Sequence, residues 1–113
     1  MKVSITQALK RLPGPPTTAY PQGAPFTTLM AGAGRDAGMR VEVFAPLGAD
    51  LQTPHAQDEL YFVHSGTAVL VINGQHFDAA AGDAFFVASG VAHQFEKISD
   101  NFVTWVVFYG PQK

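Results

Sequence analysis

The sequence predicts an all-β domain, a barrel or jelly roll of about eight short strands. From residue 26 onward, short apolar or alternating segments follow one another at regular spacing. Turns that contain glycine separate these segments, and Asn73-Gly74 is the dipeptide typical of a type I′ hairpin turn. A closed sheet also hides the apolar strand edges that would otherwise be exposed.

The composition indicates one globular domain, residues 1–113, because 47% of the residues are hydrophobic and only 14% are charged. The net charge is −2 without a basic cluster, so we expect neither nucleic acid nor a membrane surface as a partner. The absence of cysteine excludes disulfides, thiolate metal sites and cysteine nucleophiles. No apolar run approaches the roughly 20 residues of a membrane helix. Charged residues interrupt the N-terminal segment early, so we expect a cytoplasmic protein.

Residues 1–25 are expected to form a short helix followed by a proline-rich arm. Ser4 is a suitable N-cap, Gln7 completes a capping box, and Pro13 ends the helix. The apolar stripe of this helix comprises Ile5, Leu9 and Leu12. So short a helix must pack on its own domain or on a second subunit. The prolines between Pro13 and Pro25 favour an irregular arm.

The barrel itself is expected to span residues 26–110. Alternation of apolar and polar residues, or a continuous apolar run, predicts each strand. The predicted strands are Phe26–Ala31, Met39–Ala45, Glu59–His64, Thr67–Ile72, Gln75–Ala79, Ala84–Ala88, His93–Ile98 and Asn101–Tyr109.

A candidate metal site lies where one of these strands begins. In extended chain alternate residues share a face, and the row formed here comprises His55, Gln57, Glu59, Tyr61 and Val63. His93 follows a later turn. Two imidazoles and a carboxylate form a ligand set that leaves positions open on a metal ion. We therefore predict His55, Glu59 and His93 as its ligands; the alternative is that they are polar residues of the barrel mouth that bind no metal.

Residues 48–66 resemble the first sequence motif of the cupin superfamily, G-x5-H-x-H-x3,4-E-x6-G. Gly48 begins the motif, His55 matches its second histidine, and Glu59 and Gly66 keep the E-x6-G spacing. Thr53 occupies the position of the first histidine.

Residues 82–97 resemble the second motif, G-x5-P-x-G-x2-H-x3-N. Gly82, Gly90 and His93 match, whereas Ala88 replaces the proline and Lys97 the asparagine. The resemblance implies a double-stranded β-helix, the jelly-roll barrel of cupins, with one divalent metal ion inside: iron, zinc, nickel or manganese. It also implies that the loss of one imidazole leaves a two-histidine, one-carboxylate set. Otherwise the site is completed by Gln57, Gln52, Thr53 or water.

Other residues are candidates for substrate contacts. Tyr61 shares the face of Glu59, so its hydroxyl is a candidate for holding a substrate or acting as an acid, against packing alone. Gln57 is a candidate metal ligand or hydrogen-bond partner. Lys97 shares the parity of His93 and would favour an anionic substrate, unless it extends to solvent. Some aromatic side chains must line the cavity, and Phe95 is a candidate. We expect three further polar residues to lie outside the site, at the surface or in a turn: His64, His76 and Asp58.

These residues predict a metal-dependent enzyme that acts on a small polar molecule inside the barrel, of the dioxygenase, isomerase or lyase type. With iron, the ligand set suits a non-haem oxygenase. The alternative is a barrel that binds a metal or small ligand without turnover. We expect a homodimer, because small cupins commonly pair through an edge strand or a swapped N-terminal segment and the N-terminal helix and arm fit that arrangement.

Overall fold

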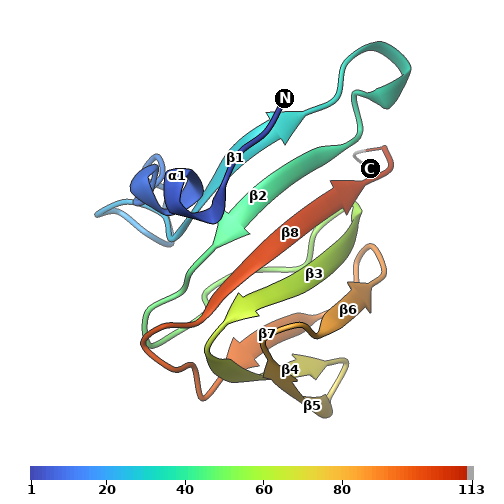
Figure 1. Ribbon diagram of the computed structural model, residues 1–113. Coiled ribbons are helices and arrows are strands. Elements are labelled where there is room, and N and C mark those ends of the chain that lie inside the picture. The colour runs from blue at the N-terminus through green and yellow to red at the C-terminus, as the bar shows by residue number, and fades with distance from the viewer. Residues whose placement is uncertain (112–113) are drawn as a thin grey trace.

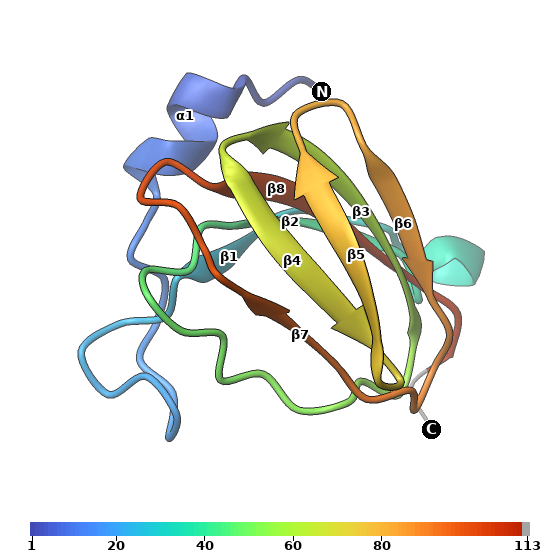
Figure 2. The same ribbon diagram turned by 90° about the horizontal axis from the view of Figure 1, so that it is seen from below.

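The computed structural model describes residues 1–111 and contains two antiparallel β-sheets that pack face to face (Figures 1 and 2). The larger sheet has the order β1 (Phe26–Ala31), β2 (Arg40–Phe44), β8 (Val103–Tyr109), β3 (Asp58–Ser65) and β6 (Ala84–Val87). The smaller sheet has the order β5 (Gln75–Ala80), β4 (Thr67–Ile72) and β7 (His93–Glu96). The predicted all-β jelly roll, with its eight strands, is confirmed.

Strand boundaries agree with the prediction most closely where the turn chemistry is clear. Asn73 and Gly74, between β4 and β5, have φ angles of 48° and 82°, as a type I′ turn requires. The largest differences are two residues: β8 begins at Val103 rather than Asn101, and β7 ends at Glu96 rather than Ile98. The reason at β7 is Lys97, whose φ of 50° ends the extended chain.

Gly66, between β3 and β4, lies where the chain leaves the larger sheet for the smaller one. Its φ is 76°, and a Cβ at this position would lie 2.5 Å from the Cα of Phe102. Only glycine fits both the backbone conformation and the space, so the sequence specifies this crossing closely.

The N-terminal helix α1 (Ile5–Lys10) covers the outer face of the larger sheet beside β1 and β2 (Figure 1). Ser4 and Gln7 form the predicted capping box. Ala8 of the helix packs into a cluster with Leu29, Val43 and Val103, so the helix docks on its own chain. Within residues 1–111 no helix has the length and apolar character needed to cross a bilayer.

The proline-rich arm is irregular, as predicted, and folds back on itself between Gly14 and Ala24. The hydroxyl of Tyr20 accepts a hydrogen bond from the backbone N–H of Leu51 at 2.7 Å. This contact fastens the arm to the connection between β2 and β3. A short 3₁₀ turn, η1 (Gly34–Asp36), interrupts the loop between β1 and β2.

The connection between β2 and β3, residues 45–57, lies along the free edge of β7. The backbone N–H of Phe95 donates to Asp50 Oδ2 at 2.9 Å, and the N–H of Gly90 donates to the carbonyl of His55 at 2.7 Å. Gln94 donates through its side chain to the carbonyl of Gln52. These bonds bring His55 next to His93 although the two lie 38 positions apart in the sequence.

Candidate metal centre

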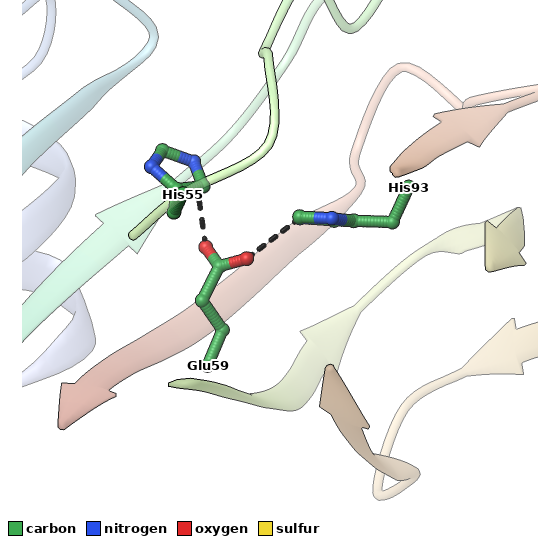
Figure 3. A group of neighbouring side chains, drawn as sticks. All are labelled: His55, Glu59 and His93. Carbon is green, nitrogen blue, oxygen red and sulfur yellow. Dashed lines mark ion pairs between the residues drawn. The ribbon is translucent and has the colours of Figure 1, made fainter. Parts of the chain in front are cut away.

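Three ionisable side chains from three separate segments converge between the sheets (Figure 3). His55 comes from the connection before β3, Glu59 is the second residue of β3, and His93 is the first residue of β7. One ligand atom from each residue lies within 4.8 Å of the other two. This is the set predicted from the sequence, and it could bind a metal ion.

Glu59 lies between the two imidazoles, with one oxygen facing each ring (Figure 3). Its Oε2 is 2.6 Å from Nε2 of His93, and its Oε1 is 3.5 Å from Nε2 of His55. The side chain is only 1% exposed, and Oε1 has no hydrogen-bond partner among the described residues. A buried carboxylate oxygen without a partner is costly. A cation between Oε1 and the imidazole nitrogens would remove that cost, so the donor set fits a divalent metal.

A hydrogen bond to the backbone, on the opposite side of the imidazole from Glu59, fixes the orientation of His93. Its Nδ1 lies 2.8 Å from the carbonyl oxygen of Val91 and donates to it, which leaves Nε2 directed at the site. Burial alone would lower the pKa of His93, but the hydrogen bonds to Glu59 and Val91 and the nearby carboxylates raise it overall. A proton on Nε2 therefore satisfies Oε2 of Glu59, and a metal ion must displace this proton to bind.

Tyr61 adds a neutral hydroxyl to the same centre. Its oxygen lies 3.1 Å from Nε2 of His93, and the hydroxyl donates to Gln52 Oε1 at 3.3 Å. Burial and, next, the charge of Glu59 raise the pKa of Tyr61 well above its usual value. The phenol therefore keeps its proton at neutral pH and serves as a hydrogen-bond donor.

A cavity of about 360 Å³ adjoins the centre and has mostly apolar walls. His55, Glu59 and Tyr61 line it, and the arm closes one side through residues 17–20. Its large apolar side chains are those of Tyr20, Phe26, Phe44, Leu51, Val106 and Phe108. A volume of this size suits one small organic molecule.

Gln57 is buried, but its side chain has other partners. Its amide nitrogen donates to the carbonyls of Gly38 and Gly110 at 2.6 and 2.7 Å, and its Oε1 accepts from Arg40 Nη1 at 2.5 Å. These contacts fasten the loop before β2 to the end of β8. They give Gln57 a structural role and leave no support for it as a ligand.

The two candidate substrate contacts outside this row are not supported by their positions. Lys97 is exposed, and its left-handed backbone breaks the alternation on which its shared face with His93 depended. Phe95 does face inward, but it is only 2% exposed and packs against Tyr61 and Phe102 in the core rather than on the cavity wall.

Two of the three further polar residues lie at the surface, as expected, whereas Asp58 belongs to β3 and not to a turn. The side chains of His64 and His76 are exposed. Asp58 begins β3, and its carboxylate accepts a hydrogen bond from the backbone N–H of Ser89 at 2.9 Å. None of the three belongs to the converging group.

Two buried acids near the site had not been recognised from the sequence. Glu42 is 8% exposed, lines the cavity, and accepts hydrogen bonds through Oε2 from Arg40 and Thr28. The alternation in β2 places Arg40, Glu42 and Phe44 on one face, but apolar Val41 and Val43 on the other made the inward face ambiguous. Asp50 is 5% exposed and lies in a segment that has no periodic pattern.

This chain is similar in sequence to one known protein and in structure to several others. An uncharacterised protein of Streptomyces coelicolor is 44% identical over 63 residues, which are 56% of this chain and 60% of that protein. The Cupin 2 conserved barrel domain protein of Salinispora arenicola has a TM-score of 0.62 at 23% identity, over 75% of this chain and 74% of that one. The DMSP lyase DddQ of Ruegeria pomeroyi has a TM-score of 0.57 at 25% identity, over 65% of this chain and 39% of the lyase.

The sequence also matches the cupin domain family over residues 40–109, from the first residue of β2 to the last residue of β8. That range contains the three converging residues and all strands except β1. This chain therefore belongs to the cupin family.

Proposed function

We propose that this protein is a metal-dependent enzyme that acts on one small molecule in the cavity between its sheets. His55, Glu59 and His93 would hold a single divalent ion. The observation that carries the proposal is the buried Oε1 of Glu59, which has no hydrogen-bond partner among the described residues and faces the imidazole of His55 beside an apolar cavity.

A divalent cation at this position supplies a Lewis acid with positions open to a substrate. The residues of the chain supply the surroundings. Glu59 contributes a negative charge, Val91 fixes the orientation of His93, and Tyr61 offers a proton-bearing hydroxyl to a polar group of the substrate. The apolar walls exclude water and so strengthen these polar contacts.

The cavity favours a substrate with a polar head and a largely apolar body. Glu42 and Tyr61 both pair with Val106 across neighbouring strands, so their backbones lie two strand spacings, roughly 10 Å, apart. Glu42 contacts Arg40 through Oε2, and its other oxygen, Oε1, can accept a hydrogen bond from a ligand in the cavity. A molecule that fits would therefore have an oxygen-containing head, an apolar middle and a hydrogen-bond donor.

Two reaction classes have specific support. The similarity to the DMSP lyase DddQ favours a lyase, whereas the two-histidine, one-carboxylate set favours an oxygenase. Protein loaded with iron, zinc, nickel or manganese should be incubated with a panel of small diketones, phenols, thiols and sulfonium compounds. Oxygen uptake would identify an oxygenase, and an elimination product detected by mass spectrometry without oxygen uptake would identify a lyase.

The second candidate is a cupin that binds a small molecule or a metal without turnover. The observation that favours it is Thr53, which stands where the cupin motif has a further imidazole. Calorimetric binding of a panel compound together with no product for any of the four metals would establish this function in place of the enzyme.

A further inference from the structure

We propose that Gln52 supplies a fourth ligand, its amide oxygen Oε1, to the metal ion, and that Asp50 holds the amide in the required orientation. This inference rests on the proposed metal centre.

The polar atoms of five side chains form a closed ring, and Gln52 belongs to it. Its Oε1 lies 3.2 Å from Nε2 of His55 and 3.3 Å from the hydroxyl oxygen of Tyr61. The ring continues from Tyr61 to Nε2 of His93 at 3.1 Å, then to Glu59 at 2.6 Å, and returns from Glu59 to His55 at 3.5 Å. Gln52 thus occupies the gap in the ring between His55 and Tyr61.

Asp50 determines which end of the amide faces the ring. The side-chain nitrogen of Gln52 donates to Asp50 Oδ2 at 2.6 Å. A carboxylate only accepts hydrogen bonds, so the nitrogen must face Asp50 and the oxygen must face the histidines. The usual ambiguity between the two ends of a glutamine amide is therefore removed by chemistry.

The orientation of Asp50 is itself fixed by the backbone. It is 5% exposed, its Oδ1 accepts from the N–H of Gln52 at 3.0 Å, and its Oδ2 also accepts from the N–H of Phe95 at 2.9 Å. Phe95 lies two residues after His93 on β7. The same carboxylate thus couples the position of Gln52 to the strand that carries a ligand.

An amide oxygen is a neutral oxygen ligand that suits the hard or borderline divalent ions expected here. Thr53 leaves the site one imidazole short of the cupin motif, and the residue before it reaches the ring instead. The resulting donor set has two imidazole nitrogens, one carboxylate oxygen and one amide oxygen. Because an amide is neutral, this set has the same net charge as the three-residue set. It occupies one more coordination position of the metal ion.

Titration of the purified protein with Co²⁺ tests the inference through the dissociation constant and the visible absorption bands, which report the ligand set without any assay of activity. Gln52→Ala should weaken Co²⁺ binding by roughly tenfold or more and change the visible bands. Gln52→Glu should bind Co²⁺ at least as tightly as the wild type, because it keeps an oxygen ligand and Asp50 repels the new carboxylate towards the cation. Gln75→Ala, at an exposed position on β5, is the matched control and should change nothing.

The Gln52→Glu variant separates a ligand from a structural residue. If Gln52 served only to bond Asp50, the glutamate would lose that bond and bind Co²⁺ as weakly as the alanine variant. For Asp50, the Asp50→Asn change should weaken Co²⁺ binding and alter the bands in the wild type, yet have no further effect in the Gln52→Ala background. Circular dichroism should confirm that each variant is folded, and Asp50→Ser serves in the same cycle if Asp50→Asn is not.

Unchanged affinity and unchanged bands in Gln52→Ala would overturn this inference while leaving the metal centre intact. An effect of Asp50→Asn that persists fully in the Gln52→Ala background would overturn the positioning role of Asp50. A wild-type protein that binds no Co²⁺ would instead overturn the proposed metal centre, and with it this inference.

Discussion

Glu59 Oε2 lies 2.6 Å from Nε2 of His93, within the distance of a strong charge-assisted hydrogen bond. The other oxygen of the same carboxylate is buried and 3.5 Å from Nε2 of His55, without a hydrogen-bond partner among residues 1–111. This asymmetry indicates that Oε2 shares a proton with His93, whereas the unpartnered Oε1 suits a metal cation.

Replacing either histidine should remove the metal and leave the fold. We expect His55→Ala and His93→Ala each to reduce bound metal from one equivalent per chain to background, because a lost imidazole leaves two ligands of the set. Elemental analysis of the purified variants measures this, with circular dichroism to confirm folding. His64→Ala and His76→Ala are controls at exposed positions. Full metal content in either site variant would show that other residues bind the ion.

Metal binding should weaken as the pH falls. The pKa of His93 is raised above its ordinary value of about 6.5, so protons compete with the metal from a pH above that value downwards. Occupancy measured by calorimetry between pH 8 and pH 5 should therefore decrease steadily. Occupancy that stays constant down to pH 5 would contradict histidine ligation.

The metal-free protein should show the opposite trend in stability. A raised folded-state pKa means that the proton on His93 stabilises the fold. That contribution is fully present below the unfolded pKa of about 6.5 and is lost as the pH rises through the folded pKa. We expect the contribution of His93 to the free energy of unfolding to decrease from pH 6 to pH 8, and His93→Ala to remove this dependence. Chemical denaturation at the two pH values checks it, and an unchanged pH dependence in the variant would contradict it.

Tyr61→Phe should separate substrate chemistry from metal binding. The variant loses a hydroxyl that stays protonated and faces the centre, so we expect unchanged metal content and roughly tenfold lower kcat/KM for the substrate found in the panel. Tyr109→Phe, at an exposed position, is the matched control. Loss of metal together with activity would instead assign Tyr61 to the metal site.

A homodimer is predicted, and the outer face of the larger sheet is the surface we expect it to bury. Helix α1 covers this face over β1 and β2, but Phe62 on β3 and Phe86 on β6 are 45% and 58% exposed. Light scattering should give twice the mass of one chain, and Phe86→Ser should lower that mass. Leu47→Ser, at an exposed loop position, is the control. A monomeric wild-type protein would end this prediction.

The strands, the capping box at Ser4 and the hairpin at Asn73-Gly74 could be predicted from the sequence because each is specified by a local pattern. Glu59 could be predicted because it lies on the buried row of β3. His93 could be predicted because it begins a strand whose alternate residues are also buried. Local periodicity and two motifs were enough for these parts.

The remaining features of the site depend on segments that have no periodic sequence pattern. Asp50 and Gln52 lie in a connection whose position is set by hydrogen bonds to Gln94 and Phe95. No local sequence pattern predicts those bonds. The predicted strand His93–Ile98 extends two residues past the observed end at Glu96, and it includes Lys97, where the backbone is left-handed. The cupin motif has asparagine there, a residue type that tolerates this conformation, and that was the available signal.

The most direct test of the metal centre is a crystal of metal-loaded protein with anomalous diffraction measured at the absorption edge of the element found by elemental analysis. The predicted result is one anomalous peak within bonding distance of Nε2 of His55, Nε2 of His93 and the carboxylate of Glu59. A structure without a peak there, or with the ion bound elsewhere, would contradict the assignment.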